Sequence, residues 1–176
     1  MASIKLTGDT SGEITISAPA VAGTNTLTLP AETGTVGIVG PTFSAYLSSA
    51  QSISSSTSTK LTFNTEEFDT NSNYDNATNY RFTPTIAGYY QINAIGRASG
   101  TSVTTALIDL FKNGSVLRQL ASSRDSTSSS QTLSGSALVQ MNGTTDYLEI
   151  YGTITGTSPS FLATHTNFSG FLVRTS

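Results

Sequence analysis

The sequence predicts an all-β protein, and three observations support this prediction. Apolar and polar residues alternate over many short stretches, which is the period of strands. Helical periodicity is absent even from the serine-rich segment 43–53, where Phe43, Ala45 and Leu47 alternate instead. Asn113-Gly114 and Asn142-Gly143 are residue pairs that accept the positive φ angles of tight hairpin turns. Short strands at this spacing are typical of a β-sandwich.

Length and composition narrow the class further. A chain of 176 residues allows one domain, or one domain with an appendage. Charged residues make up 11% and the net charge is −3, so neither nucleic-acid binding nor a basic membrane-surface patch is expected. Cysteine is absent, which excludes disulfides and thiolate metal sites. No run of eighteen apolar residues exists, so we expect no membrane insertion.

The first 40 residues form a distinct segment. Residues 14–17 and 27–29 are short alternating strands separated by a stretch rich in alanine, proline and glycine. Two such strands bury little surface, so the segment should depend on self-association or on docking to something larger. A glycine-punctuated stretch that ends at Pro41 follows. We therefore predict an attachment segment over residues 1–40 and a β-domain over residues 41–176.

Strands follow one another closely in the second segment. We predict them at residues 43–47, 60–63, 80–82, 88–97, 105–112, 115–120, 132–141, 147–155 and 167–174. Asn113-Gly114 should be a two-residue hairpin, while the turn at Asn142-Gly143 should run on to Asp146. Three tracts rich in serine and threonine, Ser48–Thr59, Ala98–Thr104 and Ser122–Ser130, are predicted to be exposed loops or strand ends.

The last strand is apolar on both faces. Phe168, Gly170 and Leu172 would point to one side, and Phe171 and Val173 to the other. A strand this close to a terminus frays unless it pairs inside a sheet. We therefore predict a central strand with one face in the sandwich core and the other face against a second copy of the chain.

The second segment resembles the globular head of complement C1q and the related tumour-necrosis-factor jelly rolls. The matching stretches occur in family order: Phe43-Ser44-Ala45, residues 60–64, 73–75, 80–84, 88–92 and 110–114, and Phe168-Ser169-Gly170-Phe171. Ile92 departs from the family, which prefers phenylalanine there. The resemblance implies a ten-stranded jelly-roll sandwich that assembles as a homotrimer.

Residues 11–36, from Ser11 to Val36, look like a module of bacteriophage and cyanophage tail-fibre and appendage proteins. In those proteins the module often precedes a terminal binding head. This resemblance distinguishes a viral fibre tip from an animal C1q-like hormone or lectin.

Enzymatic chemistry is not expected. His165 is the single histidine, and no nucleophile turn lies near it in the sequence. We predict no catalytic residues and no enzyme. The one carboxylate cluster, Glu66, Glu67, Asp69 and Asp75, matches no calcium-loop motif, so a solvated strand end is favoured and a calcium site is kept as the alternative. No other cofactor is implied.

Aromatic residues mark the core or a trimer axis. The candidates are Phe43, Tyr90, Phe168 and Phe171. Other aromatic residues, Tyr46, Tyr89, Tyr147 and Tyr151, are amphipathic enough for an interface or a carbohydrate contact, although ordinary strand-face tyrosines are favoured.

The leading hypothesis is a virion structural protein, a trimeric phage tail fibre or appendage tip. Its partners would be copies of itself, other virion proteins through residues 1–40, and a host cell-surface glycan or protein. The receptor-facing residues are unknown, with the three serine-rich tracts as first candidates. The alternatives are a capsid or tail decoration knob without receptor binding, and a bacterial secreted C1q-like binding protein outside the cell.

Overall fold

The computed structural model describes residues 3–7, 11–17, 40–163 and 165–176. Contacts divide the chain into two compact units, residues 1–38 and 39–176. In the first unit β1 (Ser3–Thr7) and β2 (Glu13–Ser17) form an antiparallel hairpin in which Ile4 lies opposite Ile16 and Leu6 opposite Ile14. The predicted strand at residues 27–29, and most of the stretch 11–36, lie outside the described residues.

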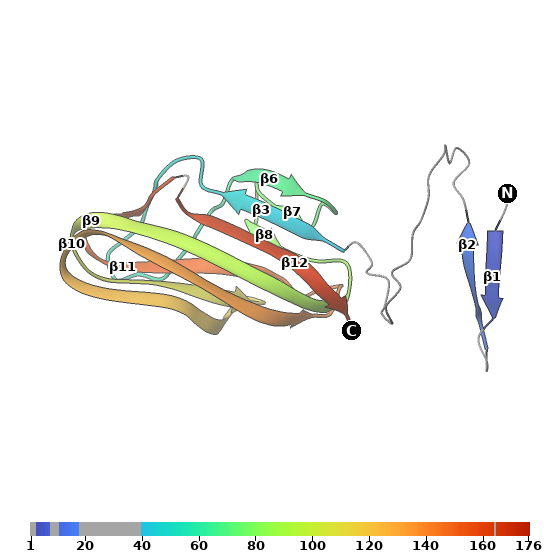
Figure 1. Ribbon diagram of the computed structural model, residues 1–176. Helices are drawn as coiled ribbons and strands as arrows, with labels where there is room; N and C mark the ends of the chain where they lie inside the picture. Colours follow the sequence, from blue (N-terminus) through green and yellow to red (C-terminus); the bar gives the residue numbers. More distant parts are fainter. Residues whose placement is uncertain (1–2, 8–10, 18–39, 164) are drawn as a thin grey trace, which may run out of the picture. The chain divides into compact units, whose positions relative to one another are not determined.

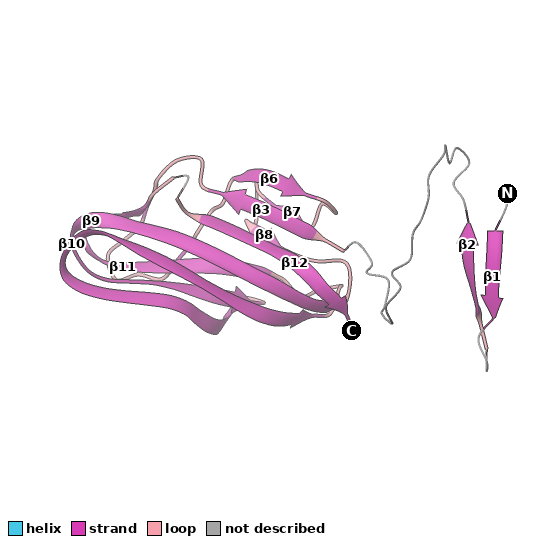
Figure 2. Ribbon diagram, in the orientation of Figure 1, coloured by secondary structure: helices cyan, strands magenta, loops and turns pink. Residues whose placement is uncertain are grey.

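The second unit is built from strands alone (Figures 1 and 2). Ten strands form one continuous hydrogen-bonded sheet that is folded into two layers. No described residue belongs to a helix, so none forms one that could cross a membrane. The strands are β3 (Thr42–Tyr46), β4 (Gln51–Ser52), β5 (Thr59–Lys60), β6 (Thr65–Asp69), β7 (Tyr74–Asp75), β8 (Arg81–Phe82), β9 (Gly88–Lys112), β10 (Ser115–Met141), β11 (Leu148–Phe161) and β12 (Asn167–Thr175).

Two long strands, β9 and β10, join the layers. The first half of β9, residues 88–99, pairs with the second half of β10, residues 130–141. In this first layer β9 also pairs with β12, β12 with β3, and β3 with β6. The second half of β9, residues 103–112, pairs with the first half of β10, residues 115–128. In this second layer β9 also pairs with β11, and β11 with β8. Each long strand therefore contributes to both layers, and Figure 1 shows them running the length of the sandwich.

The prediction of exposed loops or strand ends at Ala98–Thr104 and Ser122–Ser130 is wrong, because both tracts lie within the long strands β9 and β10. Register shifts between Arg124 and Ser128 and between Ser128 and Ser130, together with a positive φ of 53° at Ser102, bend the strands where they pass between layers. Serine and threonine tolerate such irregular strand positions, so their enrichment marks the bend instead of a chain break. Within Ser48–Thr59 only β4 and the first residue of β5 pair, both with β11.

The last strand is central, as the sequence predicts. β12 lies between β3 and β9, with Gly170 opposite both Phe43 and Ile92. Phe168 and Gly170 are buried, and Leu172 packs against the core. Phe171 points to the opposite side and is 47% exposed, while Val173, 52% exposed, falls at a register shift between Leu172 and Arg174. Pairing on both edges holds this terminal strand in place.

An aromatic cluster fills the end of the core beside β12. The Phe43 ring stacks on the rings of Phe82 and Tyr74, with centroids 4.2 and 5.2 Å away, and meets Phe168 edge to face at 4.9 Å. Tyr90 meets Phe82 edge to face and donates its hydroxyl to the carbonyl of Ile86. Each ring buries a large apolar area, and the edge contacts add about 0.5–1.5 kcal/mol per pair.

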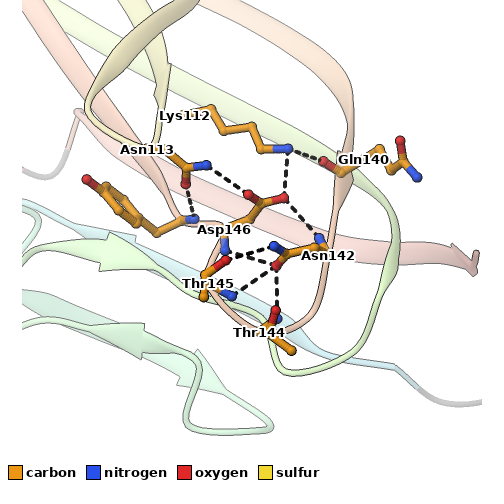
Figure 3. A network of polar contacts seen from close by, with 8 residues as sticks. Lys112, Asn113, Gln140, Asn142, Thr144, Thr145 and Asp146 are labelled. Atoms are coloured by element: carbon orange, nitrogen blue, oxygen red, sulfur yellow. Dashed lines mark hydrogen bonds and ion pairs between the residues drawn. The ribbon is translucent and has the colours of Figure 1, made fainter.

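The two Asn-Gly turns differ. Asn113 and Gly114 have φ angles of 54° and 77°, which confirms the predicted two-residue hairpin between β9 and β10. In the second pair only Gly143 has a positive φ, 71°, among the described residues. The side chain of Asn142 instead accepts hydrogen bonds from the amides of Thr144, Thr145 and Asp146 (Figure 3). This turn runs to Asp146, as expected, but a side chain holds it.

Candidate binding face

The outward side of the first layer presents a group of exposed apolar side chains. Strand register aligns its side chains in rows across three strands. Gln91 lies between Phe171 and Leu138, Asn93 lies between Ser169 and Ser136, and Ile95 lies between Asn167 and Ser134. We call these nine residues the central face. It contains no charged residue, and its apolar members Phe171, Leu138 and Ile95 are 47%, 54% and 38% exposed.

Charged side chains of opposite sign lie around this face: carboxylates on β6, and Arg97 at the end of the face, two residues beyond Ile95 on β9. Toward β6, Tyr46, Glu66, Glu67 and Asn167 line a hollow of about 280 Å³. We call it the acidic hollow. Glu67 accepts a hydrogen bond of 2.7 Å from the hydroxyl of Ser44, whereas no hydrogen bond to the Glu66 carboxylate occurs among the described residues. Burial raises the pKa of Glu66, and the nearby charges of Asp69 and Asp75 raise it further.

On the other side of Asn167, a hollow of about 250 Å³ is lined by Ile95, Arg97, Thr132, His165 and Asn167. We call it the basic hollow. The backbone amide of Arg97 donates to the hydroxyl of Thr166, but its buried Nε has no hydrogen-bond partner. No carboxylate in the described part of the chain pairs with this guanidinium. A buried donor without a partner costs about 1–3 kcal/mol, so this Nε carries a desolvation cost that the described part of the chain does not offset.

The structure divides the four aromatic candidates. Phe43, Tyr90 and Phe168 are buried in the core, while Phe171 stands on the central face. Ile95 and Leu138, the other apolar residues of that face, were not among the predicted site residues. Their alternation with Gln91, Asn93 and Ser136 would have been a usable signal, but it requires the pairing of β9 with β10 and β12 to be known.

The four carboxylates of the predicted acidic cluster do not share a site. Asp69 accepts the amides of Asn71 and Tyr74, and Asp75 accepts those of Ala77, Thr78 and Asn79. These hydrogen bonds lower the pKa of Asp75 to about 2. Among the described residues no three histidine, aspartate or glutamate side chains are placed to hold a metal ion. Asp69 and Asp75 therefore fit calcium poorly, because their oxygens already hold turns together.

His165 lies exposed beside Arg97. Within the described residues no hydroxyl or carboxylate is hydrogen-bonded to its imidazole, so the structure assembles no triad around it.

The outward side of the second layer has a different character. Phe111 and Tyr151 stack with ring centroids 3.9 Å apart, and the Arg81 guanidinium lies over the Tyr147 ring at 4.3 Å. Lys60 forms an ion pair of 2.5 Å with the buried Glu149. Tyr151 on β11 and Tyr147, just before β11, are thus both engaged with neighbouring side chains of the same chain.

Comparison with known proteins identifies the architecture. The model of the C1q domain matches residues 42–173. The globular domain of zebrafish complement 1qA protein is similar at 22% identity and a TM-score of 0.62, covering 78% of this chain and 99% of that one. Eiger TNF from S. frugiperda is similar at 11% identity and a TM-score of 0.59, and the match covers 78% of this chain and 94% of that one. Murine APRIL at pH 5.0 is similar at 7% identity and a TM-score of 0.57, and the match covers 76% of this chain and 99% of that one. No curated protein sequence matches the chain.

Proposed function

Because the chain belongs to the C1q domain family, we propose that residues 41–176 form a non-enzymatic binding head that assembles as a homotrimer through its central face. One observation carries this proposal: the nine residues of the central face are uncharged and present three exposed apolar side chains at the middle of a rigid sheet. A depletion of charge around apolar side chains is typical of the buried core of an interface.

Trimerisation is tested by the solution mass of the purified chain, measured by light scattering with and without residues 1–40. We expect three chain masses in both cases, because the central face lies wholly in the second unit. Phe171→Ser should shift the population toward single chains, since it places a hydroxyl where we expect an apolar contact. Val116→Ser is the matched control, because Val116 is 61% exposed but belongs to β10 within the second layer. A measured mass of a single chain for the wild type would overturn the proposed trimer.

We further propose that the protein is a bacteriophage tail-fibre or appendage tip, located on the virion and attached through its first 40 residues. The support is the resemblance of residues 11–36 to modules that precede terminal heads in such proteins. Three copies of a weak site on one trimer would bind a repetitive host cell-surface glycan or protein with avidity.

This finer proposal is tested by adding a fluorescently labelled trimer to candidate host cells. Labelled cells, and competition with phage adsorption, are the expected results. Labelling only of particles that lack the protein would favour the decoration knob. An origin outside a cluster of tail genes would favour the bacterial secreted C1q-like protein. Alanine substitutions within Ser48–Thr59 are the first scan for receptor contacts, because residues 54–58 are exposed.

A further inference from the structure

The outward side of the second layer holds an aspartate that the fold does not use. Asp109 lies on β9 between Tyr151 of β11 and Gln119 of β10. Its neighbours along the strand, Ile108 and Leu110, are fully buried, so Asp109 points away from the core. Asp109 is nonetheless partly buried, and this burial raises the pKa of its carboxyl.

Asp109 differs from most other acidic side chains of the second unit. No described residue forms a hydrogen bond or an ion pair with its carboxylate. Among the described aspartate and glutamate side chains of this unit, the same holds only for Glu66, which lies on the edge strand β6. The acidic side chains that do have a partner are Glu67, Asp69, Asp75, Asp146 and Glu149.

An unpartnered aspartate in the middle of a layer lowers stability. Aspartate is depleted in strands, and partial loss of water around a charge costs free energy. No contact in the described part of the chain offsets this cost at Asp109. Residues that break a local rule without a compensating contact are expected at functional sites.

Apolar and aromatic side chains flank the carboxylate. Leu107 and Phe111 are the next outward residues of β9, one on each side of Asp109, and both are partly buried. The Phe111 ring stacks on the ring of Tyr151 with centroids 3.9 Å apart. A negative charge beside aromatic rings is a combination that binds cations, because the ring faces and the carboxylate both attract positive charge.

A cationic group fits this carboxylate better than a sugar does. Lys60, opposite Tyr151 on β5, already pairs with Glu149, so the charge of Asp109 stays uncompensated. A neutral glycan would bring no opposite charge, and an acidic glycan would be repelled. An ammonium or guanidinium would form charge-assisted hydrogen bonds with the carboxylate.

We propose that Asp109, together with the pair of Phe111 and Tyr151, forms a receptor contact that takes a lysine or arginine side chain of a host cell-surface protein. The inference rests on the proposed receptor-binding head and names the chemistry of its partner. The proposed trimer uses the outward side of the first layer, so the outward side of the second layer stays accessible.

A small cation tests the site without knowledge of the receptor. We choose n-butylguanidinium, which carries the charge of an arginine side chain, and n-butylurea, its neutral analogue, as probes for NMR titration of the full chain. Butylguanidinium alone should shift the amide signals around Asp109 to saturation. Asp109→Asn should weaken this binding about tenfold or more.

Glu13→Gln is the control for net charge, because it removes one negative charge from the first unit and should bind the probe as the wild type does. Equal shifts with butylurea, or butylguanidinium binding that survives Asp109→Asn, would overturn the cation site.

Stability provides a second test. Asp109→Thr should move the midpoint of urea denaturation to a higher urea concentration, because it removes the unpartnered charge and introduces a residue that favours strands. A lower midpoint would show that the carboxylate supports the fold, and would overturn its assignment to binding.

Host cells test the class of partner. Labelling of cells by the fluorescent trimer should be lost with Asp109→Asn and after trypsin digestion of the cell surface, and should survive periodate oxidation of its glycans. Loss after periodate alone would favour a glycan and overturn the cationic side chain. Host labelling that survives Asp109→Asn would overturn the site and leave the fibre-tip role standing. Butylguanidinium binding by a protein that labels no host would keep the cation site and overturn that role.

Discussion

The Nζ of Lys112 lies 2.8 Å from Oδ2 of Asp146, and this ion pair ties the end of β9 to the turn between β10 and β11. The same Nζ donates to the carbonyl of Gln140 at 2.7 Å, and Asn113 donates to the other carboxylate oxygen of Asp146 at 2.8 Å (Figure 3). The backbone amide of Asn142 donates to Oδ2 as well. Asp146 therefore collects three donors from two turns that are far apart in the sequence.

Asp146→Ala should destabilise the second unit. It removes the acceptor for Lys112, Asn113 and the amide of Asn142. Partly buried donors that lose their acceptor lower the free energy of unfolding, and we expect a loss of about 1–3 kcal/mol. Chemical denaturation measures the change in the free energy of unfolding. Thr144→Ala is the matched control in the same turn, since the exposed Thr144 contributes only its backbone amide to the network. Equal losses for both variants would show that Asp146 has no special role.

Gly143→Ala should lower stability by more than Gly114→Ala. Both glycines have positive φ angles, 71° and 77°, so both substitutions strain the backbone. A Cβ on Gly143 would in addition lie 2.3 Å from the backbone nitrogen of Ala87, whereas one on Gly114 would meet only the Tyr147 hydroxyl at 3.3 Å. We expect about 1 kcal/mol for Gly114→Ala and clearly more for Gly143→Ala, measured by thermal denaturation. The reverse order would contradict the close approach of the two segments.

Phe168→Ala should cost about 3–5 kcal/mol in the free energy of unfolding, because it empties a fully buried site that contacts Phe43, Phe63 and Tyr74. Val116→Ala is the control for truncation of an exposed apolar side chain and should change stability by about 0.5 kcal/mol or less. Comparable effects of the two substitutions would mean that β12 does not supply the core.

Asp75 should make the second unit lose stability in acid. Its folded pKa is about 2, below its ordinary value, so the unfolded chain binds more protons as the pH falls. The stabilisation is therefore complete above pH 4 or so and disappears between about pH 4 and pH 2. Asp75→Asn should be less stable than the wild type near neutral pH, and the difference should shrink through this window. A difference that stays constant with pH would contradict the role of the charge.

Calcium should not stabilise the protein. Asp69 and Asp75 already accept backbone amides, and Glu67 accepts the Ser44 hydroxyl. We expect calorimetric titration with calcium to release no binding heat and the melting temperature to stay unchanged. A rise in melting temperature that depends on Asp69 and Asp75 would restore the calcium site.

Local sequence patterns by themselves determined several strands, the directions of their side chains and one hairpin turn. Period-two alternation located the central last strand and divided Phe168 from Phe171, because side chains alternate across any strand. Asn113-Gly114 specified its own turn, since the required φ angles depend only on those two residues. The order of C1q-like stretches indicated the jelly roll, which the family match over residues 42–173 confirms.

Only the tertiary structure decided how these strands combine. Whether Ser122–Ser130 is a loop or a bent strand depends on the hydrogen bonds that β9 offers, and no local propensity encodes them. The central face arises because Phe171, Ile95 and Leu138, distant in sequence, are placed together by register across three strands. Which side chains share a face therefore depends on pairing between strands distant in the sequence, and the alternation within one strand does not show this pairing.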